Sequence, residues 1–173
     1  MKVHFWGVRG SLPTPLSPQQ IQSKIMAAIQ RISPDDLKTA ETRAKFVSSL
    51  PSWIFGTAGG NTACVELVHN NTHNILDAGT GLRVMGKERK APDKYHMLFS
   101  HFHWDHIHGF QFFDHAYNPN VKFEIYSHQQ DAEKYFWMQF DEPFSPPSIS
   151  KTIARNIEFH LLDEDKEYYI DDI

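Results

Sequence analysis

Four side chains of metal-binding type lie within six residues of the sequence. They are His101, His103, Asp105 and His106, in the pattern H-x-H-x-D-H. Imidazole and carboxylate groups suit zinc, and they also bind iron and manganese. A surface loop has no structural need for so many of these groups together. The spacing therefore predicts a metal site as the feature around which the rest of the chain is organised.

The residues on either side of this motif predict how its side chains are presented. Tyr95 to Phe99 is a short apolar run, typical of a buried strand that ends at a loop. In an extended segment, residues two apart point to the same side, so His101 and His103 can share one ion. A helix is predicted from Ile107 to Phe113, so the last two motif residues leave in another direction and can serve a second ion. Two ions roughly 3.5 to 4 Å apart would clamp a bridging hydroxide and a substrate oxygen.

The remaining histidines are interpreted as ordinary polar residues, because a lone histidine is more often a satisfied side chain than a ligand. They are His4, His69, His73, His96, His108, His115, His128 and His160. Near the C-terminus, His160, Asp163 and Asp165 have suitable chemistry, but they fall on a predicted strand and its acidic turn. We do not expect them to complete the site.

Two further segments place a charged residue beside glycine. A first strand, Lys2 to Trp6, is followed by Gly7-Val8-Arg9-Gly10-Ser11, which predicts a tight backbone excursion. Arg9 is there either a contact for an anionic substrate or a tether to a carboxylate. Asp77 follows a predicted strand, and its carboxylate would orient a ligating histidine or hold the loop. We interpret Asp77 as a support of the metal ligands and not as a ligand.

These motifs resemble those of a known family. Residues 101 to 106 resemble the H-x-H-x-D-H signature of the metallo-β-lactamase superfamily, and Ile75 to Gly79 resembles the strand and Asp-Gly motif that precede it. Gly7 to Ser11, together with Gly59-Gly60-Asn61-Thr62, resembles more narrowly the branch that contains ribonuclease Z, the phosphonate-pathway cyclic phosphodiesterase and related phosphodiesterases. The resemblance covers nearly the whole chain apart from the segment between Pro15 and Phe55.

The resemblance implies a four-layer αβ/βα sandwich, of which this chain matches the N-terminal half. In the family, the second half supplies a third histidine, a metal-bridging aspartate and a final histidine, and nothing after His106 matches those motifs. We therefore expect residues 1–173 to be a single, incomplete domain of this type. The missing ligands would come from sequence absent here or from a partner chain, and a homo-oligomer is one such arrangement.

The resemblance also implies a function, that of a metal-dependent hydrolase, in particular a phosphodiesterase that uses a metal-bound hydroxide. His101 and His103 would hold one zinc ion and Asp105 and His106 the other, with manganese or iron as alternatives. Asp105 is also the candidate catalytic residue, placed to accept a proton or to orient the hydroxide. The substrate would be a small phosphodiester or a nucleotide-like molecule. The alternative is a truncated metal-binding domain with little or no activity, because two protein ligands per ion bind metal weakly.

Composition narrows the class of protein. The chain has 173 residues, of which 40% are hydrophobic, enough for one domain with its own core. A net charge of -4 predicts no general attraction for nucleic acid. The single cysteine, Cys64, excludes an internal disulfide, and its neighbours indicate a buried strand position. No apolar run approaches the roughly 18 residues of a membrane span, and no signal-peptide pattern opens the sequence, so we predict a cytoplasmic protein without a membrane segment.

The pattern of elements predicts an α/β fold, a sheet with helices packed on its outer face. Residues from about 17 to 50 read as an inserted helical hairpin, because Ser17-Pro18 and Ser33-Pro34 are both helix starts and each is followed by an apolar stripe. The first helix is predicted to reach about Ile32 and the second to end near Leu50. The hairpin would be a lid, a dimerisation surface or simple packing.

The other predicted elements are a hairpin of Thr62 to Val68 with Asn74 to Leu76, strands at Val121 to Tyr126, Ile157 to Leu162 and Tyr168 to Ile170, and a helix from a Ser127 cap to about Phe140. Trp53-Ile54-Phe55 is read as a core anchor, with the wall of a substrate pocket as the alternative.

Overall fold

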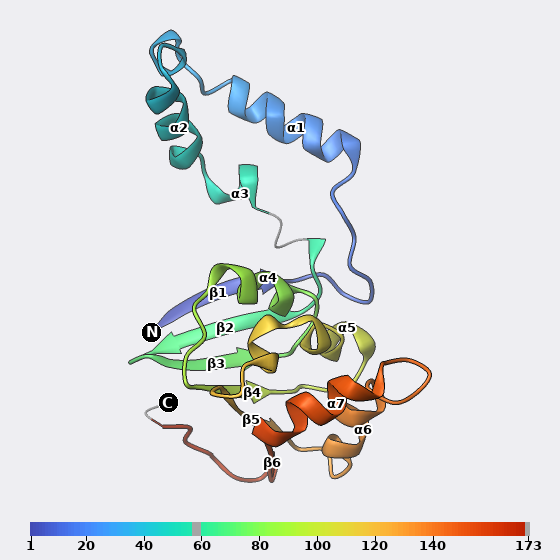
Figure 1. Ribbon diagram of the computed structural model, residues 1–173. Coiled ribbons are helices and arrows are strands. Elements are labelled where there is room, and N and C mark those ends of the chain that lie inside the picture. The colour runs from blue at the N-terminus through green and yellow to red at the C-terminus, as the bar shows by residue number, and fades with distance from the viewer. Residues whose placement is uncertain (57–59, 172–173) are drawn as a thin grey trace.

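The computed structural model describes residues 1–56 and 60–171 (Figure 1). Its strands are β1 (Lys2–Gly7), β2 (Cys64–His69), β3 (Thr72–Leu76), β4 (Lys94–Leu98), β5 (Lys122–Ser127) and β6 (Ile157–Leu161). Its α-helices are α1 (Pro18–Ile29), α2 (Ala40–Ser49), α3 (Ser52–Phe55), α4 (Gly81–Glu88), α5 (Trp104–Ile107), α6 (Ala132–Met138) and α7 (Pro147–Ile153). Short 3-10 helices are η1 (Pro34–Leu37), η3 (Phe110–Phe112), η4 (Asp114–Tyr117) and η5 (Ala154–Asn156).

The strands form one sheet in the order β1-β2-β3-β4-β5-β6. The first three strands are antiparallel neighbours, and β3 to β6 run parallel. Asn70 and Asn71 connect β2 to β3 and both have positive φ, of 45° and 66°. Two such residues suit a tight hairpin turn, since asparagine tolerates the left-handed conformation. The predicted hairpin is confirmed.

The helices of the body cover one face of this sheet. Each parallel strand is joined to the next through helices: α4 leads to β4, α5 with η3 and η4 leads to β5, and α6 with α7 and η5 leads to β6. Crossovers between parallel strands are almost always right-handed, and each new strand is added on the same side of the sheet. All three connections must then lie on one face, as Figure 1 shows. The predicted α/β class is confirmed.

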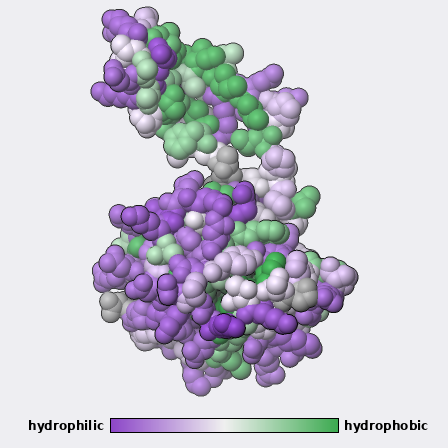
Figure 2. All heavy atoms as spheres, in the orientation of Figure 1, coloured by the Kyte–Doolittle hydropathy of each residue, from purple (hydrophilic) through white to green (hydrophobic). Residues whose placement is uncertain are grey.

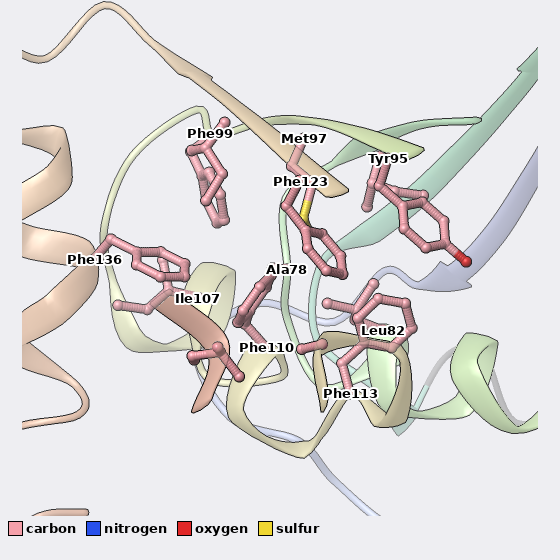
Figure 3. Close-up of a cluster of buried hydrophobic side chains, with 14 of the residues drawn as sticks. Ala78, Leu82, Tyr95, Met97, Phe99, Ile107, Phe110, Phe113, Phe123 and Phe136 are labelled. Atoms are coloured by element: carbon pink, nitrogen blue, oxygen red, sulfur yellow. The ribbon is translucent and has the colours of Figure 1, made fainter. Parts of the chain in front are cut away.

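The core lies between the sheet and these helices and is rich in aromatic rings (Figure 3). Tyr95 and Phe123 stack at 5.6 Å between ring centroids, and Phe110 meets Phe136 edge to face at 4.9 Å. Cys64 is fully buried in β2, as predicted. This packing forms a rigid support for the segment after β4, which contains the metal motif.

The opposite face of the sheet carries apolar side chains that remain in solvent. In β1, Val3 and Phe5 alternate with His4 and Trp6, and Phe5 is 62% exposed. We call this side of the sheet the open face. Within residues 1–56 and 60–171, no helix is long and apolar enough to cross a bilayer.

Residues 17–55 form an arm that projects away from the sheet (Figure 1). Ser17 caps α1 through a capping box, as the sequence predicts, and no residue of α1, η1 or α2 is buried. Ile21, Ile25 and Ile29 face solvent, and Figure 2 shows apolar residues gathered along the arm. The predicted helices therefore exist, but their apolar stripes do not pack on the body of this chain.

Several predicted boundaries in the arm were wrong. The first helix ends at Ile29, short of Ile32. The second is divided, because Thr39 forms a capping box of its own and starts α2 after η1. Of the Trp53-Ile54-Phe55 cluster, only Ile54 is buried, so a single side chain anchors α3.

Three predicted elements after residue 100 also differ from the structure. Ser127 ends β5 and α6 begins only at Ala132, because the Ser127 hydroxyl accepts a hydrogen bond from Gln129 before the helix starts. Tyr168 to Ile170 is not a strand, since the chain turns at Asp163 and the Tyr168 hydroxyl accepts a local hydrogen bond from the Asp163 amide. The predicted helix over 107–113 is replaced by α5 and η3.

Candidate metal centre

The three motif histidines lie together just beyond the end of β4. The ring centroids of His101 and His103 are 4.5 Å apart, and those of His101 and His106 are 4.0 Å apart. His101 and His103 belong to an extended segment, as predicted, and His106 comes from the turn of α5. The structure therefore brings His106 beside His101 as well, in place of the separate direction that the sequence predicted for it.

Asp77 lies behind these histidines and hydrogen-bonds to the residues that carry them. Its Oδ1 accepts from the Ser100 amide at 2.9 Å, and its Oδ2 lies 2.8 Å from His106 Nδ1. The Ser100 hydroxyl lies 2.8 Å from Oδ2 and 3.0 Å from His101 Nδ1. Asp77 thus holds the loop and orients a histidine, which are the two roles considered for it from the sequence.

This network determines which ring nitrogens remain available. A carboxylate accepts only, so His106 donates through Nδ1. The single hydroxyl proton of Ser100 goes to Asp77, so Ser100 accepts from His101 Nδ1. Nε2 is then the unprotonated nitrogen of both neutral rings, the arrangement that ligating histidines have when an outer hydrogen bond fixes the tautomer. No role was predicted for Ser100 from the sequence, although it directly precedes His101.

Asp105 is held by the loop that follows β1. The Ser11 amide donates to Asp105 Oδ2 at 2.7 Å, and His106 Nε2 lies 3.4 Å from the same oxygen. Burial raises the pKa of Asp105, but the Ser11 hydrogen bond and the neighbouring histidines outweigh it and lower the pKa below its ordinary value. Asp105 is therefore ionised at neutral pH.

The same loop contains Arg9. Its Nε donates to the Thr14 hydroxyl at 3.1 Å, and Arg9 bridges to Thr62 through the backbone. No carboxylate partner of Arg9 is found among the described residues, where its side chain contacts the Thr14 hydroxyl instead. Ser11 adopts a positive φ of 63°, which brings its amide to Asp105. Gly59 of the opening motif lies outside the described residues.

Close backbone packing fixes the Asp77 loop against the motif. The Ala78 amide donates to the His106 carbonyl at 2.6 Å. A Cβ on Gly79 would lie 2.3 Å from the Asp105 carbonyl oxygen, and one on Gly109 would lie 1.9 Å from the Gly79 oxygen. Only glycine fits at these two positions, so the Asp-Gly motif is needed for the approach of the two segments.

The donor set fits a metal ion. Burial, followed by the charges of His106 and His103, lowers the pKa of His101 below its ordinary value, so its imidazole is neutral near pH 7. Neutral imidazole and ionised carboxylate are the forms that bind zinc. Within residues 1–56 and 60–171, however, three ligand atoms lie within 4.8 Å of one another only at Glu124, Glu158 and His160. The motif residues meet in pairs and would have to adjust to share an ion.

The Glu124 group lies on β5 and β6, apart from the motif. Glu124 and Glu158 are paired across the two strands, and His160 hydrogen-bonds to Glu124. Other histidines also have ordinary partners, as predicted: His115 bonds to the Tyr95 hydroxyl, and His73 bonds to Glu66. His160 thus has its hydrogen-bond partner on β5.

The motif lies at the surface, with His101, Asp105 and His106 half-buried. His103 is exposed, and two surface hollows of about 440 and 460 Å³ lie elsewhere, the first beside Lys94 and Asp171 and the second beside Glu124 and Arg155. The hollows contain none of the motif residues.

Comparison with known proteins gives little further information. No family model matches the chain, and no curated protein sequence matches it. A crystal structure from Thermotoga maritima, provisionally described as a metallo-beta-lactamase, is similar with a TM-score of 0.40 and 21% identity, covering 66% of this chain and 54% of that chain. This chain thus spans about half the length of the similar structure. A likeness at this level does not assign a family.

Proposed function

We propose that this protein is a metal-dependent hydrolase of phosphodiesters. The observation that supports the proposal best is the arrangement of His101 and His106, whose rings lie 4.0 Å apart with Nδ1 engaged in each, and with His106 Nε2 beside the ionised Asp105. These half-buried polar groups are not part of the hydrophobic core. Theirs is the ligand chemistry of zinc, with manganese or iron as alternatives.

Each residue of the motif has a role in this proposal. His101, His103, Asp105 and His106 would hold the metal, and Asp77 fixes the tautomer of His106. A bound metal supplies a water that is activated for attack near neutral pH and polarises the ester oxygen. Asp105 is ionised, and besides holding the metal it would orient the attacking water or accept its proton.

The phosphodiester class rests on the loop after β1. This loop contacts the site through Ser11 and carries Arg9 within two residues of that contact. A phosphodiester transition state gains negative charge, which metal cations and a guanidinium are suited to stabilise. The loop also bears the motif that resembles the phosphodiesterase branch. A β-lactam or thioester substrate would rest on the shared motif alone, which is a weak basis for chemistry.

A second candidate function is a metal-binding domain with little or no catalytic activity. The observation that favours it is that the motif residues meet in pairs, with no third protein ligand joining them among residues 1–56 and 60–171. Sites with only two protein ligands per ion have low affinity. The missing ligands, if the protein is a hydrolase, come from a partner chain or from sequence beyond these residues.

The test is metal analysis followed by an activity assay. We expect purified protein to contain zinc, iron or manganese, and the metal to be lost when His101→Ala and His103→Ala are combined. The matched control combines His69→Ala and His128→Ala, which leaves the motif unchanged. Equal metal content in both double variants would contradict the site.

The metal-loaded protein is then assayed with bis(p-nitrophenyl) phosphate. We expect metal-dependent hydrolysis, slowed at least ~100-fold by Asp105→Asn, which removes the proton acceptor. Metal binding without hydrolysis would favour the second candidate function. Turnover of nitrocefin or a thioester without phosphodiester hydrolysis would overturn the substrate class.

A further inference from the structure

Three aromatic side chains form a row that starts inside the metal motif. Trp104, His108 and Phe112 follow one another at four-residue steps along α5 and η3. The Trp104 and His108 rings meet edge to face at 6.3 Å between centroids, and His108 meets Phe112 in the same way at 5.3 Å. We call these three residues the aromatic row. Trp104 is 59% exposed and Phe112 is 50% exposed.

The core of the protein does not use this row. Within the same segment, Ile107 and Phe110 are the buried side chains and supply the packing against the sheet. Tryptophan is a large side chain that proteins usually bury for much of its surface, whereas Trp104, in a hydrogen-bonded turn within the motif, leaves more than half of its surface to solvent. The aromatic row is thus available to a ligand.

The position of the row connects it with the candidate metal centre. Trp104 lies between His103 and Asp105 and is the first residue of α5. The turn is held by backbone hydrogen bonds from the His106 amide to the His103 carbonyl and from the His108 amide to the Trp104 carbonyl, at 3.0 and 2.9 Å. The backbone that positions the metal ligands therefore also positions the first two rings of the row.

We propose that the aromatic row is a subsite for a planar aromatic ring carried by one ester group of the substrate. This inference rests on the proposed function and deepens it, since it names aryl or nucleoside esters as the substrate class. The row offers the π faces and edges of an indole, an imidazole and a phenyl ring, and few hydrogen-bonding groups. Such a surface suits stacking, which accepts any flat ring and discriminates against a sugar or an alkyl chain.

A ring bound there would lie beside the metal ligands, so the phosphate that carries it would reach the site without a long spacer. The exposed Trp53 on the arm, which is 56% exposed, has a different environment: Arg31 lies over its ring at 5.3 Å. Trp53 is thus a matched comparison of the same residue type and exposure, remote in sequence from the motif.

The experiment compares two phosphates that differ by an aromatic ring. Adenosine 5′-monophosphate and ribose 5-phosphate are titrated by calorimetry into the full chain loaded with zinc. We expect the first to bind about tenfold more tightly, within the range for one stacked base. The measured quantity is the ratio of the two affinities. A change in the metal site alters the binding of the phosphate in both compounds alike and leaves this ratio unchanged.

Substitutions test whether the aromatic row causes the preference for adenosine 5′-monophosphate. We expect Trp104→Ala to reduce the ratio to about one, Phe112→Ala to reduce it in part, and Trp104→Phe to retain most of it. Trp53→Ala should leave the ratio unchanged. If Trp104→Ala does not fold, as seen by circular dichroism, Phe112→Ala and Trp104→Phe carry the test.

Several results would overturn the subsite: equal affinities in the unaltered protein, no binding of either compound, or the same loss in Trp53→Ala. A Trp104→Ala variant that changes the oligomeric state but keeps the ratio would make the row a protein contact and would also overturn it. Failure of the two proposals can be told apart. Hydrolysis of bis(p-nitrophenyl) phosphate without the ring preference contradicts only the subsite, and a preference lost in Trp104→Ala without hydrolysis supports the subsite and contradicts the hydrolase.

Discussion

Asp77 adopts a left-handed backbone conformation, with φ of 59°, that few residues tolerate. Its carboxylate hydrogen-bonds to Ser100 and His106, so the conformation directs one side chain at two segments of the candidate metal centre. Ser11 has a φ of 63° and directs its amide at Asp105. Strained residues of this kind are stable only where the surroundings hold them, and in this protein both support the candidate ligands.

Replacing Asp77 with asparagine tests this role at the residue scale. Asparagine also tolerates positive φ, so Asp77→Asn removes the charge without adding backbone strain. We expect zinc affinity to fall about 10- to 100-fold, as for other outer partners of ligating histidines. Competition with a chromophoric chelator measures it. The control is Asp114→Asn, which alters an exposed ion pair with Lys87. Equal affinities in both variants would contradict the orienting role.

At the scale of elements, α4 has a glycine where a helix would gain from alanine. Gly86 lies inside α4 and faces Phe113, which is fully buried. A Cβ at Gly86 would lie 2.8 Å from the Phe113 ring, closer than carbon atoms approach in proteins. The helix and the segment after η3 therefore pack closely because Gly86 has no side chain.

Two effects compete in Gly86→Ala. Alanine gains about 1 kcal/mol in helix propensity, whereas overpacking of a filled core costs about 1 to 3 kcal/mol. We expect the free energy of unfolding to fall by roughly 1 kcal/mol, because the buried Phe113 ring has little room to move. Urea denaturation measures the change. Gly10→Ala is the control, since a Cβ on Gly10 would meet nothing within 4 Å. A more stable Gly86→Ala protein would contradict this prediction and would show that the Phe113 ring moves to make room for the added methyl group.

At the scale of the whole molecule, two apolar surfaces lack a partner in this chain. One is the open face of the sheet, with Val3 and Phe5, and the other is the stripe of α1, with Ile25 and Ile29. The crossover rule explains the first, because it places all the helices of the body on the other side. The second surface lacks a partner because the arm projects away from the body, so that no residue of α1, η1 or α2 is buried.

We expect these surfaces to cause self-association at micromolar concentration, since apolar patches of this kind mark interaction sites or aggregation. Sedimentation velocity should show oligomers, and Phe5→Lys and Ile25→Lys should each reduce them. Gln22→Lys adds the same charge to an exposed polar position of α1 and should have no effect. A monomer that binds no apolar dye would contradict this expectation.

Much of the local structure could be predicted from the sequence. The alternation of β1, β2 and β5 and the capping box at Ser17 depend on neighbouring residues, and so does the shared direction of His101 and His103. The prediction failed where two helix caps follow one another closely: Ser33 starts η1, but Thr39 caps a new helix, so the second predicted helix of the arm is divided.

The contacts that complete the candidate site could be decided only by the tertiary structure. Ser11 and Asp105 are 94 residues apart, and Asp77 and His106 are 29 apart. Whether such segments meet depends on strand order and on backbone packing at Gly79 and Gly109, which no short pattern encodes. The sequence by itself determined which groups could bind metal, because those groups are adjacent in the chain. The fold decided which nitrogens they present and what supports them, because hydrogen bonds between distant segments require the whole sheet to be in place.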